Sequence, residues 1–192
     1  TTSYSSNAIQ LNSSYMFVNS LVDLSKVTVF IVLKGTGQFN KTLFTATPVS
    51  GVSWETLDAF SFYVSNQSPS VAIYGEYNSP LQINANALIP QVYSIQSSGT
   101  SLSAWYNGVS QTGRTLTSTR TSTARGFAIG AEYYSNTYNN VGANASFYEL
   151  LVYNSALSTN ERQQVESYLA FKWGLQASLP SDHSYKITPP SV

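Results

Sequence analysis

The sequence predicts an all-β domain in which two layers of antiparallel strands pack together, with one α-helix near the C-terminus. Short runs rich in β-branched and aromatic residues recur along the chain, separated by turn residues. Between two such runs lies Asn107-Gly108, the strongest short-range signal for a β-hairpin. Apolar and polar residues alternate only partly within the runs, as expected for strands packed between two layers. We therefore expect a single sandwich domain over residues 1–192.

The expected strands are short and lie between turn-forming residues. They cover 27–33, 59–64, 71–77, 91–97, 101–113 (a hairpin turning at Asn107-Gly108), 126–132 and 145–153. The first of them, VTVFIVL, is a continuous apolar run rich in β-branched residues, which favours a strand covered on both faces.

The helix is expected over residues 158–173. Ser158 with Glu161 three positions later forms a capping box, a pattern that begins helices. Gly174 suits the left-handed position just past a helix end, and Leu175 can pack back as the hydrophobic partner of that cap.

One stripe of this helix is expected to be apolar and to dock on the strands. Its members are Val165, Tyr168, Leu169 and the stem of Lys172. A helix of about fifteen residues is marginal alone in water, so it should clamp across an open sheet surface, with Trp173 as an anchor. The tail over 176–192 follows it.

Composition excludes several classes of partner. Charged residues make up only 9%, and the nine basic residues balance the nine acidic ones, which argues against nucleic acid. The chain has no cysteine, and no run approaches the ~20 apolar residues of a membrane span. Because it begins at Thr1 without a methionine, we expect a processed product or a fragment.

The C-terminal part resembles a known family. The matching residues are Glu149, Tyr153-Asn154, Leu157-Ser158, Glu161-Arg162, Tyr168-Leu169, Lys172-Trp-Gly-Leu175, Leu179-Pro180, His183 and Tyr185, together with LSAWYNG (102–108) and FAIGA (127–131) upstream. This pattern resembles concanavalin A-like, laminin-G-like domains, and within them a subgroup of large DNA viruses, phages and bacterial surface proteins. Ser184 departs from it, since the subgroup often has proline there.

The resemblance implies a two-sheet antiparallel jelly roll that binds glycans or proteins and is displayed on a surface. The same fold hosts lectins, glycanases and inert structural modules, so fold alone does not decide the function.

No catalytic residues are predicted. A retaining glycanase needs two carboxylates about 5–5.5 Å apart, but Glu55 and Asp58 are three apart, which on a strand puts them on opposite faces. Glu76, Glu132 and Glu149 each stand alone. His183, the single histidine, has Asp182 beside it, and we expect it to belong to a structural tail that folds back on the body rather than to a catalytic triad.

Phosphate and metal sites are also not expected. GTGQFNKT (35–42) nearly spells a phosphate-binding loop but has Asn40 for its second glycine and leads into a β-forming run, so we interpret it as a hairpin connection. Three arginines, Arg114, Arg120 and Arg125, fit a solvated strand and loop. The three aspartates, Asp23, Asp58 and Asp182, are spread apart, so we predict no metal and no cofactor.

The candidate binding segment is AEYYSNTYNNVGAN (131–144), which joins two expected strands. Loops of this length are often functional when ordered. Rigid aromatic rings and side-chain amides suit neutral sugars, but they suit a protein interface as well, and the loop could simply be packed by its own tyrosines. The predicted ligand-binding residues are Tyr133, Tyr134, Tyr138, Asn139 and Asn140, with Trp54 and Trp105 as possible additions.

We therefore predict a non-catalytic recognition module, extracellular or on a virion surface, that binds a glycan or host-surface receptor and contacts neighbouring surface proteins, with homo-oligomerisation possible. The alternative is a structural capsid, spike or fibre component that acts through protein contacts alone. A glycoside hydrolase is the third and least favoured hypothesis.

Overall fold

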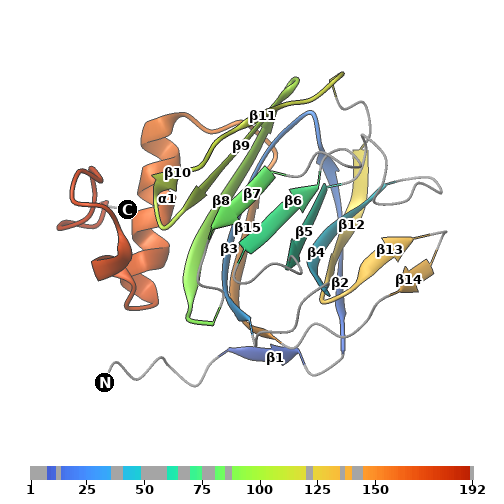
Figure 1. Cartoon of the computed structure of the whole chain (residues 1–192), viewed down its shortest axis with the longest axis horizontal. Coiled ribbons are helices and arrows are strands. Elements are labelled where there is room, and N and C mark those ends of the chain that lie inside the picture. The colour runs from blue at the N-terminus through green and yellow to red at the C-terminus, as the bar shows by residue number, and fades with distance from the viewer. Residues whose placement is uncertain are drawn as a thin grey trace.

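The computed structural model describes residues 8–11, 14–35, 41–48, 60–64, 70–74, 81–84, 88–119, 123–134, 137–139 and 145–190. Figure 1 shows two antiparallel sheets packed face to face, with a helix lying outside one of them. The all-β sandwich predicted from the sequence is confirmed.

Sheet A carries the helix on its outer face. Its strands, in spatial order, are β1 (Ile9–Leu11), β15 (Ala145–Tyr153), β3 (Lys26–Gly35), β8 (Gln91–Ser98), β9 (Ser101–Tyr106) and β10 (Val109–Ser110), and β11 (Arg114–Thr115) also pairs with β9. The apolar run predicted as a fully covered strand is β3, which lies between β15 and β8 and is buried from Val27 to Leu33.

Sheet B forms the second layer. Its order is β2 (Met16–Asp23), β12 (Thr123–Ile129), β4 (Lys41–Pro48), β5 (Phe60–Val64), β6 (Ser70–Tyr74) and β7 (Leu81–Asn84). Because β3 lies in one sheet and β4 in the other, residues 36–40 connect the two layers. The expected hairpin between these strands is therefore wrong, since neither strand pairs with the other.

The core lies between the sheets. Phe62 from sheet B meets Tyr93 from sheet A edge to face at 5.0 Å, and burial raises the pKa of the Tyr93 hydroxyl. Within sheet B, the rings of Phe44 and Phe127 stack at 4.9 Å. Burying a side chain of this size contributes about 1.5–3 kcal/mol, so this layer is the main source of stability.

Helix α1 (Thr159–Lys172) has the ends that the sequence predicted. The Ser158 hydroxyl accepts the Glu161 N–H at 3.3 Å, while the Glu161 carboxylate accepts the Ser158 N–H at 2.8 Å. At the other end Gly174 has φ +69°, and the Leu175 N–H donates to the Ala170 carbonyl at 2.7 Å. This is a Schellman motif, and it buries Leu175 beneath the helix.

The buried face of α1 differs from the expected apolar stripe. Tyr168 is 42% exposed, and Lys172 is exposed as well. The buried positions include Leu169 but also the charged pair Arg162 and Glu166. An analysis of helical periodicity assigns charged residues to the exposed face of a helix. Two opposite charges that form an ion pair with each other can nevertheless be buried. Trp173 packs against the buried apolar residues between α1 and sheet A, as expected of an anchor. These residues are Phe30, Val32, Val92, Leu169, Ala170, Leu175 and Leu179.

The Asn107-Gly108 turn is confirmed. Asn107 has φ +49° and Gly108 φ +80°, and the strands on either side pair Tyr106 with Val109. Positive φ at both central positions is the requirement of a type I′ turn.

Candidate functional site

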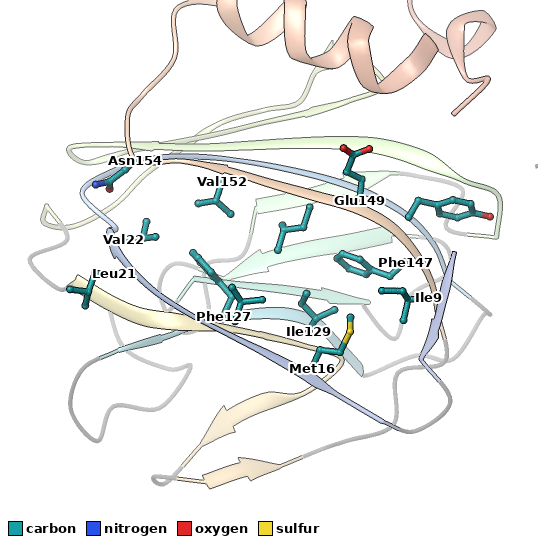
Figure 2. Close-up of a pocket in the computed structure, with 13 residues that line it drawn as sticks. Ile9, Met16, Leu21, Val22, Phe127, Ile129, Phe147, Glu149, Val152 and Asn154 are labelled. Carbon is teal, nitrogen blue, oxygen red and sulfur yellow. The ribbon is translucent and has the colours of Figure 1, made fainter. Parts of the chain in front are cut away.

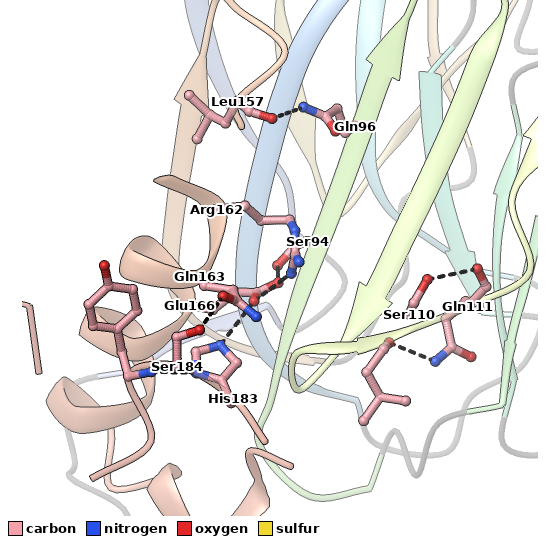
Figure 3. A network of polar contacts seen from close by, with 12 residues as sticks. Ser94, Gln96, Ser110, Gln111, Leu157, Arg162, Gln163, Glu166, His183 and Ser184 are labelled. Atoms are coloured by element: carbon pink, nitrogen blue, oxygen red, sulfur yellow. Dashed lines mark hydrogen bonds and ion pairs between the residues drawn. The ribbon is translucent and has the colours of Figure 1, made fainter. Parts of the chain in front are cut away.

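A buried polar network joins α1 and the tail to sheet A. The Arg162 guanidinium donates through Nη1 to both carboxylate oxygens of Glu166, each at 2.6 Å. The Ser94 hydroxyl of β8 donates to Glu166 Oε1 at 2.7 Å, and His183 Nε2 from the tail lies 3.3 Å from Oε2 (Figure 3). Arg162, Glu166, Ser94 and His183 are all buried.

The state of His183 follows from its partners. Its Nδ1 accepts the N–H of Tyr185 at 3.3 Å, so the ring proton lies on Nε2 and is donated to Glu166. Asp182 is exposed, and Ser94 bonds Glu166 rather than the histidine. Ser94 and His183 thus both bond Glu166 and do not bond each other, so these three residues lack the serine–histidine hydrogen bond of a catalytic triad.

The β9–β10 turn packs directly on this network. The Arg162 guanidinium lies over the Trp105 ring at 4.0 Å, a cation–π contact. A Cβ at Gly108 would stand 2.8 Å from His183 Cδ2, so a side chain there would collide with the histidine. Asn107 Oδ1 accepts the Val92 N–H at 3.0 Å. The segment LSAWYNG (102–108) and His183 of the tail, distant in sequence, thus lie in contact.

The far end of the helix has a second polar contact. Lys172 Nζ donates to Glu149 Oε1 at 2.9 Å, and Trp173 Nε1 donates to Oε2 at 2.7 Å. The hydrogen bond to Glu149 is the main reason that the pKa of Lys172 is raised. Glu149 is thus occupied in holding the helix to β15.

The remaining acids whose side chains are described also have local roles, apart from the exposed Asp182. The Asp23 carboxylate accepts the Ser25 N–H at 2.9 Å, and hydrogen bonds from Ser25 lower its pKa. Hydrogen bonds from Ser158 lower the pKa of Glu161. Within the described residues, no group of three or more His, Asp or Glu could hold a metal ion, and no helix could span a membrane.

The structure separates the predicted ligand-binding residues. Part of the expected loop forms a hairpin of β13 (Glu132–Tyr134) and β14 (Thr137–Asn139), with Tyr133 paired to Tyr138. This hairpin contacts β4 of sheet B (Figure 1). Trp105, by contrast, lies on β9 of sheet A, where the Arg162 guanidinium covers its ring. Trp54 and Asn140 lie outside the described residues.

An apolar pocket that the sequence did not predict opens between the two sheets. It has a volume of about 460 Å³ and lies where the edges of β2 and β15 face each other (Figure 2). It is lined by Ile9, Met16, Val18, Leu21, Val22, Phe127, Ile129, Phe147, Tyr148, Glu149, Leu150, Val152 and Asn154. Most of these residues would be assigned to the core, so only knowledge of which strands lie at the sheet edges could have found it.

The Glu149 carboxylate and the Oδ1 atom of Asn154, two polar groups of the lining, are already bonded within the fold. Glu149 points toward the helix in Figure 2 and is bonded there. Asn154 Oδ1 accepts the backbone N–H of Asp23 at 2.8 Å, across the mouth. The lining of the pocket is therefore mostly apolar.

No protein-family model matches the sequence, and a search of curated proteins gives no match. Solved structures do share the fold. A mutant NanB sialidase from Streptococcus pneumoniae aligns with a TM-score of 0.60 and 15% identity over 81% of this chain and 27% of that chain. A SAP-like pentraxin from Limulus polyphemus gives 0.60 and 14% over 84% and 77%.

A third similar structure is the CBM40 module of Ruminococcus gnavus IT-sialidase bound to α2,3-sialyllactose. Its TM-score is 0.55, with 14% identity over 80% of this chain and 95% of that module. The chain thus spans about a quarter of the NanB chain but nearly all of this module. At such identities the likeness shows the fold, a lectin-type jelly roll, as the resemblance implied.

Proposed function

We propose that this chain is a non-catalytic carbohydrate-binding module displayed outside a cell or on a virion. The observation that carries the proposal is the β13–β14 register, which places Tyr133 directly opposite Tyr138 in a two-stranded hairpin. Directly opposed residues of an antiparallel pair share a face, and tyrosine is a residue type that stacks on a pyranose ring. Asn139, next to Tyr138, supplies an amide that both donates to and accepts from hydroxyls.

Two further observations support this function. The CBM40 module of similar fold and size is a binding domain, and its structure holds a sialylated sugar. The buried or bonded acids of this chain stabilise its helix and turns, which leaves no described pair for glycoside hydrolysis. The neutral composition favours neutral sugars over acidic ones.

Calorimetric titration of the protein with lactose and with α2,3-sialyllactose tests the proposal. We expect saturable binding at millimolar or lower concentration, weakened about tenfold or more by Tyr133→Ala and by Tyr138→Ala, since tenfold corresponds to ~1.4 kcal/mol of lost stacking. Tyr168→Ala is the matched control, because that tyrosine is exposed on the helix, outside the other sheet. Absence of saturable binding, or equal affinity in all three variants, would refute a sugar site at this hairpin.

The second candidate function is a structural one, as a capsid, spike or fibre component. The exposed apolar side chains along β2 favour it: Phe17, Val18 and Leu21 are 46%, 42% and 71% exposed. This function predicts a chain that binds no sugar alone and holds a fixed position in a particle, with β2 covered. Cryo-electron microscopy of the parent particle would show that contact or its absence.

A further inference from the structure

The inter-sheet pocket has the form of a long, narrow slot. Its lining runs along β2 from Met16 to Val22 and along β15 from Phe147 to the following Asn154. At ~3.3 Å per residue these stretches are roughly 20 Å long. If it is spread evenly over that length, a volume of about 460 Å³ corresponds to a mean cross-section of roughly 20 Å², which is comparable to that of one extended hydrocarbon chain.

The slot is open because both sheets end there. Among the described residues, β2 has β12 as its one neighbour, and β1 pairs with β15 only from Ala145 to Phe147. Behind the mouth the walls are core residues: Phe127 and Ile129 are 2% and 4% exposed. Core side chains thus form the inner wall of the slot.

Its mostly apolar lining favours an apolar ligand. A sugar or peptide group inside would lose hydrogen bonds to water and find few replacements, because the Glu149 carboxylate and the Oδ1 atom of Asn154 are already bonded. An apolar cavity of ~150 Å³ suffices to hold benzene, and this slot has about three times that volume.

We propose that the slot binds the alkyl chain of a single-chain amphiphile, such as a fatty acid or long-chain alcohol, with its polar head left at the mouth. This site is separate from the sugar site proposed above, and neither depends on the other. The slot lies between β2 and β15, whereas the proposed sugar site lies on the hairpin of β13 and β14.

Calorimetric titration of the whole chain with butanoate, hexanoate, octanoate, decanoate and 1-decanol, each below its micelle concentration, tests the inference. Affinity should rise about threefold to fourfold per added methylene, because each buried methylene contributes ~0.8 kcal/mol, until the slot is full. Decanol and decanoate should bind with similar affinity, since the head group stays in water. An affinity independent of chain length would overturn the proposal.

Val18→Asp places a charge at the mouth and should weaken decanoate binding at least tenfold. Val109→Asp is the matched control, because this valine on β10 is 47% exposed against 42% for Val18 and does not line the slot. Leu21→Trp, at a 71% exposed position, blocks the mouth without disturbing the core. Equal binding by all variants, or a chain that elutes as a dimer and binds no decanoate, would show that the slot is not an alkyl site.

Discussion

Two sides of the sandwich differ in how their strands are covered. On the closed side, where β9 and β10 meet α1 and the tail, a buried arginine, glutamate, serine and histidine satisfy one another. On the open side, where β2 faces β15, apolar side chains line a slot and strand edges are uncovered among the described residues. The closed side thus contributes to the stability of the fold, whereas the open side contains unfilled volume. We therefore expect substitutions on the closed side to lower the free energy of unfolding more than substitutions on the open side.

The largest effect is expected from Glu166→Ala on the closed side. Removing the carboxylate leaves Arg162 buried without its partner, and loss of one member of a buried pair costs about 3–5 kcal/mol. Urea denaturation should show this fall in the free energy of unfolding. On the open side, Leu21→Ala should change it by less than ~0.5 kcal/mol, as is usual for exposed positions.

The double variant Arg162→Met with Glu166→Leu separates lost charge pairing from lost packing. It removes both charges together, so it should be more stable than Glu166→Ala alone. If the double variant is the less stable of the two, the cost comes from packing, and an unpaired buried charge is not what destabilises Glu166→Ala.

A smaller effect is expected where the turn meets the tail. Gly108→Ala places a methyl group 2.8 Å from the His183 ring and also strains a residue at φ +80°. Gly99→Ala is a matched control, since Gly99 has φ +58° but nothing within 4 Å of its Cβ. We expect ~1 kcal/mol of strain in the control and a further ~1–3 kcal/mol at Gly108, read from thermal unfolding. Equal losses of stability in the two variants would show that the His183 ring moves aside without an energetic cost.

The smallest effect concerns the start of α1 and depends on pH. Hydrogen bonds from Ser158 lower the pKa of Glu161 in the folded chain. Its contribution is therefore fully present above the unfolded pKa, near 4.5, and is lost as the pH falls through the lower folded pKa. The difference in unfolding midpoint between the wild type and Glu161→Gln should shrink as the pH falls from 7 to 3. A difference that grows toward pH 3 would contradict this.

Much of the fold could be predicted from the sequence because its signals are local. The apolar run of β3, the Asn107-Gly108 turn and the caps of α1 each specify their structure within a few residues. The short edge strand β1 and the edge strand β2 were not predicted, because edge strands have weak or partly exposed patterns. Which strands share a sheet also depends on long-range pairing, so the crossing from β3 to β4 was mistaken for a hairpin.

The candidate sites show the same division. The tyrosine-rich segment can be identified in the sequence from its residue types, but its pairing as a hairpin of β13 and β14 cannot. The slot depends on where each sheet ends, which no local pattern encodes. Burial of Arg162 and Glu166 depends on Ser94, 68 residues before the arginine, and on His183, 17 residues after the glutamate, so helical periodicity alone does not reveal it.

The position of β15 beside β3 has a consequence for synthesis. About 110 residues separate Gly35 from Ala145, so at ~5–20 residues per second β3 leaves the ribosome roughly 6–20 s before its neighbour exists. During that interval one flank of the most apolar strand is bare, and a bare apolar flank invites pairing between nascent chains. Slow translation should therefore lower the yield of this protein, whereas supplying 145–190 as a separate peptide during synthesis should raise it.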